Sequence, residues 1–148
     1  MENIKLEARK LFYEGLCCAQ VLVKLGLRAK ALENDTLLNC VSGLCNGMFS
    51  GNNCGILTGA ALMLCLFDRE NAIRFMIPEL NEWFLETYGT VNCSQLAGSK
   101  RYAQKEKCMQ MTEDTIDKCQ ELMSEFGVSL KMCIRDRSSG LSLHCPLR

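Results

Sequence analysis

Residues 54–67 read CGILTGAALMLCLF and contain the longest apolar run of the chain, from Gly55 to Phe67. The run is apolar on every side of a helix, which is typical of a helix buried at the centre of a fold. It is about thirteen residues long, too short to cross a bilayer, because a membrane-spanning helix needs about 20. The segment therefore predicts a central, buried helix that begins near Cys54.

Apolar residues recur at helical spacing on both sides of this segment. We expect a first helix to stop at Gly26, and Pro78 either to break a later helix near Ile77 or to lie in the first turn of a new one. Residues 46–53, dense in Gly, Asn and Ser, predict a loop. No segment alternates as a strand does. The expected fold is all-α, a compact bundle of about five helices. These cover residues 3–25, about 32–41, from Cys54 onward, about 70–88 and about 102–126, with a short turn at 92–96.

The composition restricts the function classes. The 148 residues include 17 Lys and Arg against 17 Asp and Glu. A net charge of zero argues against a general binder of nucleic acid or of anionic membranes. The N-terminal residues contain no apolar signal segment, so a cytoplasmic location without membrane insertion is expected. In that compartment the eleven cysteines are expected to be core residues, redox thiols or metal ligands rather than structural disulfides.

The last residues of the chain differ in character. Helical periodicity stops, and neither a cap nor a packing face is visible in residues 132–148. We expect this segment to be a disordered or foreign tail. It holds Cys133, Cys145 and the single histidine, His144. Catalysis by a Cys–His or Ser–His pair is therefore not expected in the helical domain, residues 1–131.

No two cysteines have the Cys-x-x-Cys spacing. Its absence excludes a thioredoxin-type pair and the common zinc-ribbon and ferredoxin spacings, so the fold must gather any functional thiols. Cys54 precedes the apolar helix, where the helix dipole and free N–H groups stabilise a thiolate, and we expect its pKa to be lowered. Gly55 and Gly59 lie one turn apart, which predicts the close approach of another helix or loop.

Cys93 repeats this arrangement at the start of a short helix. Cys18 lies on the apolar stripe of the helix predicted at 3–25, and Cys108 precedes or opens the last helical segment. The neighbouring Cys17 points about 100° away from Cys18 and is not expected to pair with it. The other cysteines of the helical domain are expected at packing or accessory positions: Cys17, Cys40, Cys45, Cys65 and Cys119.

Four short motifs follow one another in the chain: Cys18-Ala19-Gln20, residues 42–48 (SGLCNGM), Cys54-Gly55-x-x-x-Gly59, and residues 93–96 (CSQL). In this order and spacing they resemble the C_GCAxxG_C_C family, small helical proteins described as redox-active, with four hallmark cysteines and a CGAxxG motif. The resemblance runs from about Leu11 to Cys108. It implies that the hallmark cysteines fall on Cys18, Cys54, Cys93 and Cys108. The chain departs from the pattern at Ile56, where the motif has Ala, and at Cys45, where the loop has Gly.

The leading hypothesis is a cytoplasmic thiol redox protein that uses these four cysteines, gathered in one pocket, for thiol–disulfide exchange or electron transfer. Cys54 would be the low-pKa nucleophile, and Cys93 or Cys18 the resolving thiol. The Gly- and Asn-rich loop would supply backbone donors to the thiolate or to a bound anion. Four cysteines allow three pairings, and the sequence does not choose among them. A redox partner protein is expected, and whether the chain is an enzyme stays open.

Two other classes fit the same residues. In a metal-binding protein, the sulfurs of Cys18, Cys54, Cys93 and Cys108 would be the ligands of zinc or of an iron–sulfur cluster. In a non-catalytic helical interaction domain, the cysteines would be small apolar residues. Trp83, Phe84 and Tyr88 would then anchor a partner or a homodimer, unless they pack in the core. The sequence leaves open whether any cofactor is bound, and metal analysis separates the first alternative from the others.

Overall fold

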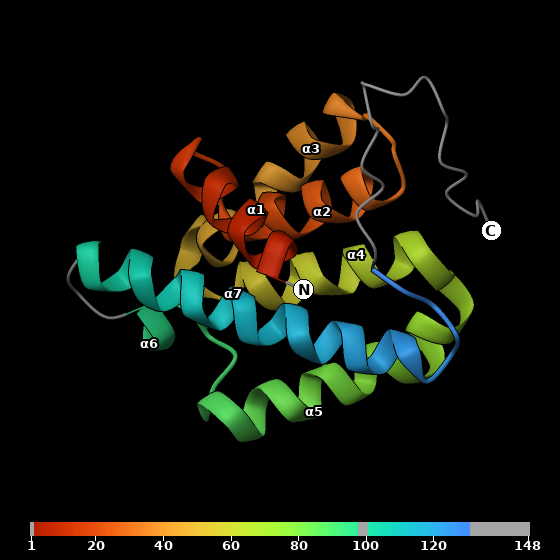
Figure 1. The fold of residues 1–148 in the computed structure, drawn as a ribbon. Coiled ribbons are helices and arrows are strands. Elements are labelled where there is room, and N and C mark those ends of the chain that lie inside the picture. The colour runs from red at the N-terminus through yellow and green to blue at the C-terminus, as the bar shows by residue number, and fades with distance from the viewer. Residues whose placement is uncertain (1, 98–100, 131–148) are drawn as a thin grey trace.

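The computed structural model describes residues 2–97 and 101–130, so Cys133, His144 and Cys145 lie outside the described residues. The described part is built of helices and contains no β-strand (Figure 1). The prediction of an all-α bundle is therefore confirmed. The α-helices are α1 (Glu2–Tyr13), α2 (Cys18–Ala29), α3 (Asp35–Val41), α4 (Gly55–Asn71), α5 (Ile77–Tyr88), α6 (Cys93–Ala97) and α7 (Arg101–Ser124).

The central helix is α4, as the sequence predicted. It contacts α2, α5 and α7, and it lies between α2 and α5 in Figure 1. Its Ile56, Met63 and Leu64 are completely buried, and each such side chain contributes roughly 1.5–3 kcal/mol by leaving water. In the described part of the chain no helix, α4 included, is long and apolar enough to cross a membrane.

The prediction of a single helix over residues 3–25 is wrong. The first helix ends at Tyr13 and α2 begins at Cys18, because Gly15 has a left-handed backbone (φ +98°) that a right-handed helix does not contain. Gly26 does not end a helix. It lies inside α2, where a Cβ atom would come within 3.0 Å of Cγ of Met63 on α4. As a result of this break, Cys17 is the N-cap residue of α2 and Cys18 is its first residue.

Pro78 occupies one of the two positions expected for it, and a glycine ends the helix that follows. Pro78 lies in the first turn of α5, which follows α4 through a π-helical turn, η3 (Ala72–Met76). Gly89 adopts φ +78° and ends α5. The helix predicted at 70–88 is therefore the end of α4, the turn η3 and α5.

The connection from α3 to α4 is a sequence of tight turns, η1 (Ser42–Leu44) and η2 (Gly47–Gly51), where a loop was predicted. The backbone is left-handed at Asn46 (φ 53°) and at Gly47 (φ +61°). It stays left-handed at Met48 (φ 60°) and Phe49 (φ 55°), although neither is a glycine. Met48 and Phe49 are also 60% and 69% exposed. This connection, residues 42–54, leads directly into α4.

An aromatic cluster joins α5 to α7. The Trp83 and Phe84 rings each meet the Tyr88 ring edge-on, with centroids 5.9 Å and 4.8 Å away. Phe84 is completely buried, and the Tyr88 hydroxyl donates a 3.0 Å hydrogen bond to Oδ2 of Asp114 on α7. These rings therefore pack within the bundle, and nothing in the described residues supports their use as a dimer anchor.

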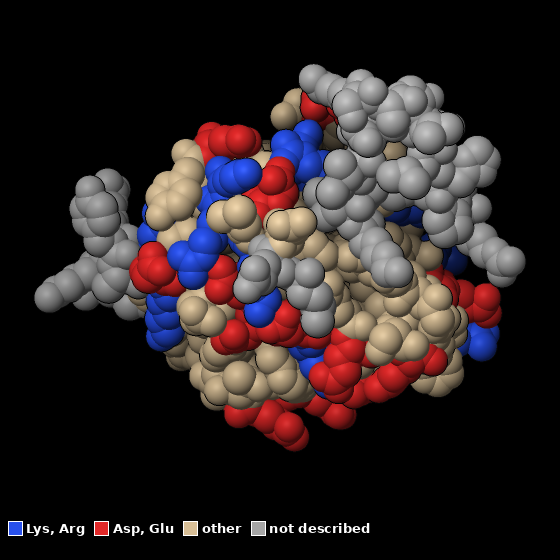
Figure 2. All heavy atoms as spheres, viewed as in Figure 1, with Lys and Arg blue, Asp and Glu red and all other residues tan. Residues whose placement is uncertain are grey.

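Ion pairs fasten α1 over α7. Lys5 Nζ lies 2.6 Å from Oδ2 of Asp117, and Arg9 Nε lies 2.5 Å from Oε1 of Glu113. Basic and acidic side chains are interspersed on the face seen in Figure 2, in keeping with the zero net charge of the whole chain. Because such surface pairs contribute at most about 1 kcal/mol each, they orient α1 more than they stabilise the fold.

Candidate functional site

The four predicted cysteines line one cavity. Its volume is about 300 Å³, and Cys18, Cys54, Cys93 and Cys108 all reach its wall. Cys18, Cys93 and Cys108 lie in α2, α6 and α7, and Cys54 is the residue that precedes α4. The rest of the wall is mostly apolar, with Phe12, Leu16, Leu96, Ala97 and Met111 among the lining residues. The fold thus gathers thiols that are far apart in the sequence.

Close packing of α2 on α4 positions Cys18. A Cβ atom on Gly59 would lie 2.7 Å from Cα and 2.9 Å from the carbonyl oxygen of Ala19, which follows Cys18. The space beside Gly55 is only slightly larger, because a Cβ atom there would lie 3.3 Å from the Leu44 carbonyl oxygen. The close approach predicted for this pair of glycines is confirmed, and it places the start of α2 beside the start of α4.

Cys54 caps α4, yet its thiol is not acidic. The backbone N–H groups of Ile56 and Leu57 lower its pKa, as a helix N-terminus should. Burial has the larger and opposite effect, since Cys54 is only 4% exposed, and the pKa is raised to about 11. The expectation of a low-pKa nucleophile at Cys54 is therefore wrong: loss of water around the sulfur outweighs the helix end.

Backbone pairing between two loops brings Cys93 next to Cys54. The Cys54 N–H donates to the carbonyl oxygen of Val91 at 2.8 Å, and the Cys93 N–H donates to that of Asn52 at 2.7 Å. The Ser94 hydroxyl adds a 3.1 Å bond to the carbonyl of Gly51. Cys93 begins α6, but burial raises the pKa of its thiol, with a further contribution from the nearby Cys108.

Cys18 and Cys108 form a hydrogen-bonded pair. This bond is the largest cause that raises the pKa of Cys18 well above its ordinary value and the largest cause that lowers the pKa of Cys108. Of the two thiols, Cys108 is therefore the one whose pKa is lowered and Cys18 the one whose pKa is raised. Burial also raises the pKa of Cys18, whereas the positive charge of Lys107 helps to lower that of Cys108.

The positions of these two thiols differ from the predicted ones. Cys18 is the first residue of α2 rather than a position inside a long helix. Cys108 lies within α7, well after its first residue, Arg101, and does not open a helical segment. The lowered pKa thus falls at Cys108 rather than at Cys54, and its largest cause joins two segments 90 residues apart in sequence.

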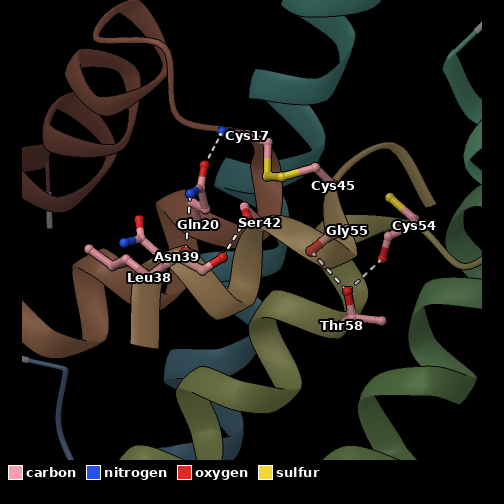
Figure 3. Close-up of a disulfide and its surroundings, with 9 residues drawn as sticks. All are labelled: Cys17, Gln20, Leu38, Asn39, Ser42, Cys45, Cys54, Gly55 and Thr58. Atoms are coloured by element: carbon pink, nitrogen blue, oxygen red, sulfur yellow. Dashed lines mark hydrogen bonds between the residues drawn. A yellow bond between two sulfur atoms is a disulfide. The ribbon is translucent and has the colours of Figure 1, made fainter. Parts of the chain in front are cut away.

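A disulfide joins Cys17 to Cys45, with their Cα atoms 5.7 Å apart (Figure 3). Sequence reasoning treated both residues as packing or accessory positions and expected no structural disulfide. Cys17 precedes α2 in an extended backbone conformation, and its N–H donates to Oε1 of Gln20 at 3.2 Å. The Gln20 amide in turn donates to the carbonyl of Leu38 on α3. The only available signal was proximity to candidate residues: Cys17 adjoins Cys18, and Cys45 lies in the loop before Cys54.

The remaining cysteines of the described residues lie away from the cavity. Cys119 is completely buried, which raises the pKa of its thiol to about 12, and it packs in the core as predicted. Cys65 is half-buried against the same core, as predicted. Cys40 is exposed on α3, so of the two roles expected for it, packing or accessory, it does not have the packing one.

The four sulfurs of the cavity could serve either as redox thiols or as metal ligands. Within residues 2–97 and 101–130, no three or more His, Cys, Asp or Glu side chains are arranged to hold a metal ion. The four thiols do not form a ready-made ligand set, and the zinc or iron–sulfur alternative stays a prediction. The polar donors found at the Cys54 sulfur belong to α4 itself, whereas the Gly- and Asn-rich loop contributes Asn46 to the cavity wall.

Comparison with known proteins agrees with this arrangement. Residues 16–122 match the model of a family described as "Putative redox-active protein (C_GCAxxG_C_C)". The chain belongs to the C_GCAxxG_C_C family. The match includes all four cavity cysteines and both cysteines of the disulfide. No curated protein matches the chain, and no solved structure does. The resemblance read from Cys18, Cys54, Cys93 and Cys108 is therefore confirmed at the level of the family.

Proposed function

We propose that this C_GCAxxG_C_C protein carries out thiol–disulfide exchange with Cys18 and Cys108 as its reactive dithiol. The observation that carries the proposal is the hydrogen bond between these two thiols in the wall of an accessible cavity. A thiolate is the nucleophile of exchange, and the bond from Cys18 favours the thiolate at Cys108. The same bond keeps the resolving thiol in contact with the sulfur it must later attack.

The exchange balances as follows. The Cys108 thiolate attacks one sulfur of a substrate disulfide, forms a mixed disulfide and releases the first substrate thiolate. Cys18 then loses its proton and attacks the Cys108 sulfur, which forms the Cys18–Cys108 disulfide and releases the second thiolate. The dithiol gives up two electrons, and its two protons leave with the two substrate thiols.

Cys54 and Cys93 are supporting thiols in this proposal. Burial is the main cause that raises the pKa of each, so both stay protonated near neutral pH. A protonated thiol attacks a disulfide poorly. Their neutrality leaves Cys108 as the sulfur of the cavity that is favoured as a thiolate.

Trapping the mixed disulfide tests the proposal. In Cys18→Ser, a hydroxyl still donates to Cys108, but no resolving thiol is present. Oxidised glutathione should therefore leave one glutathione unit on Cys108, located by peptide mass mapping, whereas the unaltered chain should form Cys18–Cys108. Cys108→Ser is the matched variant and should acquire no comparable adduct in the cavity. Adduct formation first on Cys54 or Cys93 would contradict the assignment.

The alternative classes are measured in the same preparation. Zinc, iron and visible absorbance are determined on anaerobically purified protein before exchange is assayed. Stoichiometric metal that is lost on replacement of Cys18 or Cys108 would favour the metal-binding alternative. Unchanged reactivity towards disulfides after both replacements would favour the interaction domain.

A further inference from the structure

The charged groups that the described residues contribute to the wall of the cavity are positive only. Its lining residues include one charged side chain, Lys105, and no Asp or Glu among the described residues. Asn46 and Gln104 are the uncharged polar residues of the lining, and the rest is apolar or sulfur-bearing. A cavity with a cation and no carboxylate favours a ligand that carries negative charge.

Lys105 is well placed to meet such a ligand. It precedes Cys108 by three residues on α7, so the two side chains lie on the same face of the helix, about one turn apart. Its Nζ lies 5.2 Å from the centroid of the Tyr13 ring, and Tyr13 is 70% exposed. The ammonium is thus held near the rim, and it forms no ion pair with a carboxylate in the part of the chain that the structure describes.

The size of the cavity restricts what can reach the sulfurs. A volume of about 300 Å³ is at the lower end of the range for small-molecule sites. Phe12, Leu16 and Met111 lie in the same wall as the thiols. A cavity of this volume favours a small disulfide over one held within a folded protein, which would bring its own backbone to the cavity mouth.

We propose that the substrate of the Cys18–Cys108 pair is a low-molecular-weight disulfide bearing a carboxylate, which Lys105 binds while the disulfide sulfur meets Cys108. This inference rests on the proposed function and adds the substrate class to it. One Cys108–S bond forms as the substrate S–S bond breaks, and the first thiolate leaves with its carboxylate. Attack by Cys18 releases the second half, so one substrate disulfide yields two thiols and one protein disulfide.

The test compares disulfides of different charge in a single turnover of the reduced pair. Oxidised glutathione is anionic, hydroxyethyl disulfide neutral and cystamine cationic. Each rate constant is divided by that of the same disulfide with free dithiothreitol, which removes differences in intrinsic reactivity. The exposed Cys40 is replaced by serine in every variant to avoid a side reaction, and peptide mapping verifies Cys17–Cys45 before and Cys18–Cys108 after the reaction.

At low ionic strength the normalised rate constant should be largest for the anionic probe, smaller for the neutral one and smallest for the cationic one. Each should exceed the next by a factor of roughly three to ten. Lys105→Gln should abolish this order. Lys10→Gln, which removes an exposed lysine outside the cavity lining, should keep it. Added salt should compress the order, because it screens the lysine.

The order persisting in Lys105→Gln would overturn the inference. So would a faster normalised reaction with insulin, a protein disulfide, than with oxidised glutathione. Either result would leave the Cys18–Cys108 exchange itself standing. If none of the disulfides yields Cys18–Cys108, the proposed function fails and the inference falls with it, so the two failures are distinguishable.

Discussion

Cys17 and Cys18 are neighbours in the sequence, yet the structure gives them opposite states. The sulfur of Cys17 is bonded to Cys45, whereas that of Cys18 is a free thiol that donates to Cys108. Cys17 precedes α2 with an extended backbone, and Cys18 is the first helical residue. The start of one helix therefore directs adjacent side chains to different segments. The partner each sulfur meets, rather than its local motif, decides between a crosslink and a reactive thiol.

The two pairs also differ in what they are expected to support. The disulfide closes a loop with a sequence separation of 28 residues and joins the start of α2 to the connection between α3 and α4, residues 42–54. The thiol pair joins α2 to α7 without a covalent bond. If the roles are separate, changes at the first pair alter stability, and changes at the second alter exchange chemistry.

The largest effect is expected from removal of the disulfide. Cys17→Ala/Cys45→Ala should lower the free energy of unfolding by roughly 3–4 kcal/mol, because the unfolded chain regains the entropy of an open loop of this length. Urea unfolding measures the loss. Cys40→Ala, at an exposed free thiol, is the control and should change stability by less than about 0.5 kcal/mol.

The same double variant tests whether the pairs are independent. The pH profile of alkylation at Cys108 should keep its midpoint below that of an ordinary thiol, because the hydrogen bond from Cys18 remains. A midpoint that rises to about 8.5, the value of a free thiol, would show that the disulfide positions Cys18 and that the two regions act as one.

A smaller loss is expected at the contact that both pairs share. In Gly59→Ala the new methyl group would meet backbone atoms of Ala19 at 2.7 Å and 2.9 Å, which cannot rotate away. Separation of α2 from α4 should cost about 2 kcal/mol and slow exchange at Cys108. Gly43→Ala is the matched control, since a Cβ there meets nothing within 4 Å. Equal stability of the two variants would show that the close approach is not needed.

The helix starts that carry the candidate site were readable from local signals. Glycine and asparagine before an apolar run marked the start of α4, and the same kind of signal marked α6. The break between α1 and α2 was not readable. Leu11, Cys18, Leu22 and Leu25 stay in helical phase across it, so periodicity alone conceals a turn of four residues, 14–17.

The properties missed by sequence reasoning are those that depend on distant segments. The helix end at Cys54 was identified correctly, but its pKa follows from how deeply α4 is buried. The acidity of Cys108 follows from contact with α2, and the Cys17–Cys45 bond follows from the path of residues 42–51. These contacts join segments that are distant in the sequence, so they cannot be predicted before the arrangement of the helices is known.

Buried thiols and disulfide-bonded cysteines should differ in how they make the free energy of unfolding depend on pH. Burial raises the pKa of Cys119 to about 12, so the native state keeps a proton that the unfolded state loses above about pH 8.5. The free energy of unfolding should therefore fall with rising pH, by about 1.2 kcal/mol for this thiol between pH 9 and 10. Cys54, with its pKa raised to about 11, adds to the slope with the same sign.

Cys119→Ala isolates this effect, because a slope is insensitive to the cavity that the substitution creates. Urea unfolding at several pH values should show that the variant loses about 1.2 kcal/mol of this decrease between pH 9 and 10. Cys17 and Cys45, held in a disulfide, do not titrate, so Cys17→Ala/Cys45→Ala should lower stability while leaving the slope unchanged. An unaltered slope in Cys119→Ala would contradict the assigned burial.

The smallest effect concerns the connection that the disulfide anchors. Phe49 has φ 55°, a left-handed conformation that costs a residue with a side chain about 1 kcal/mol relative to glycine. Its ring is 69% exposed, so little burial is lost in Phe49→Gly. This variant should therefore be more stable by about 1 kcal/mol in urea unfolding. Leu85→Gly, at a 51% exposed position inside α5, is the control and should lose stability instead.

The same substitution in the Cys17→Ala/Cys45→Ala background tests whether the disulfide holds this backbone. The stability gained by Phe49→Gly should be smaller there, because a connection without the disulfide can leave the left-handed conformation on its own. An equal gain in both backgrounds would show that the Cys17–Cys45 bond does not hold this backbone in place.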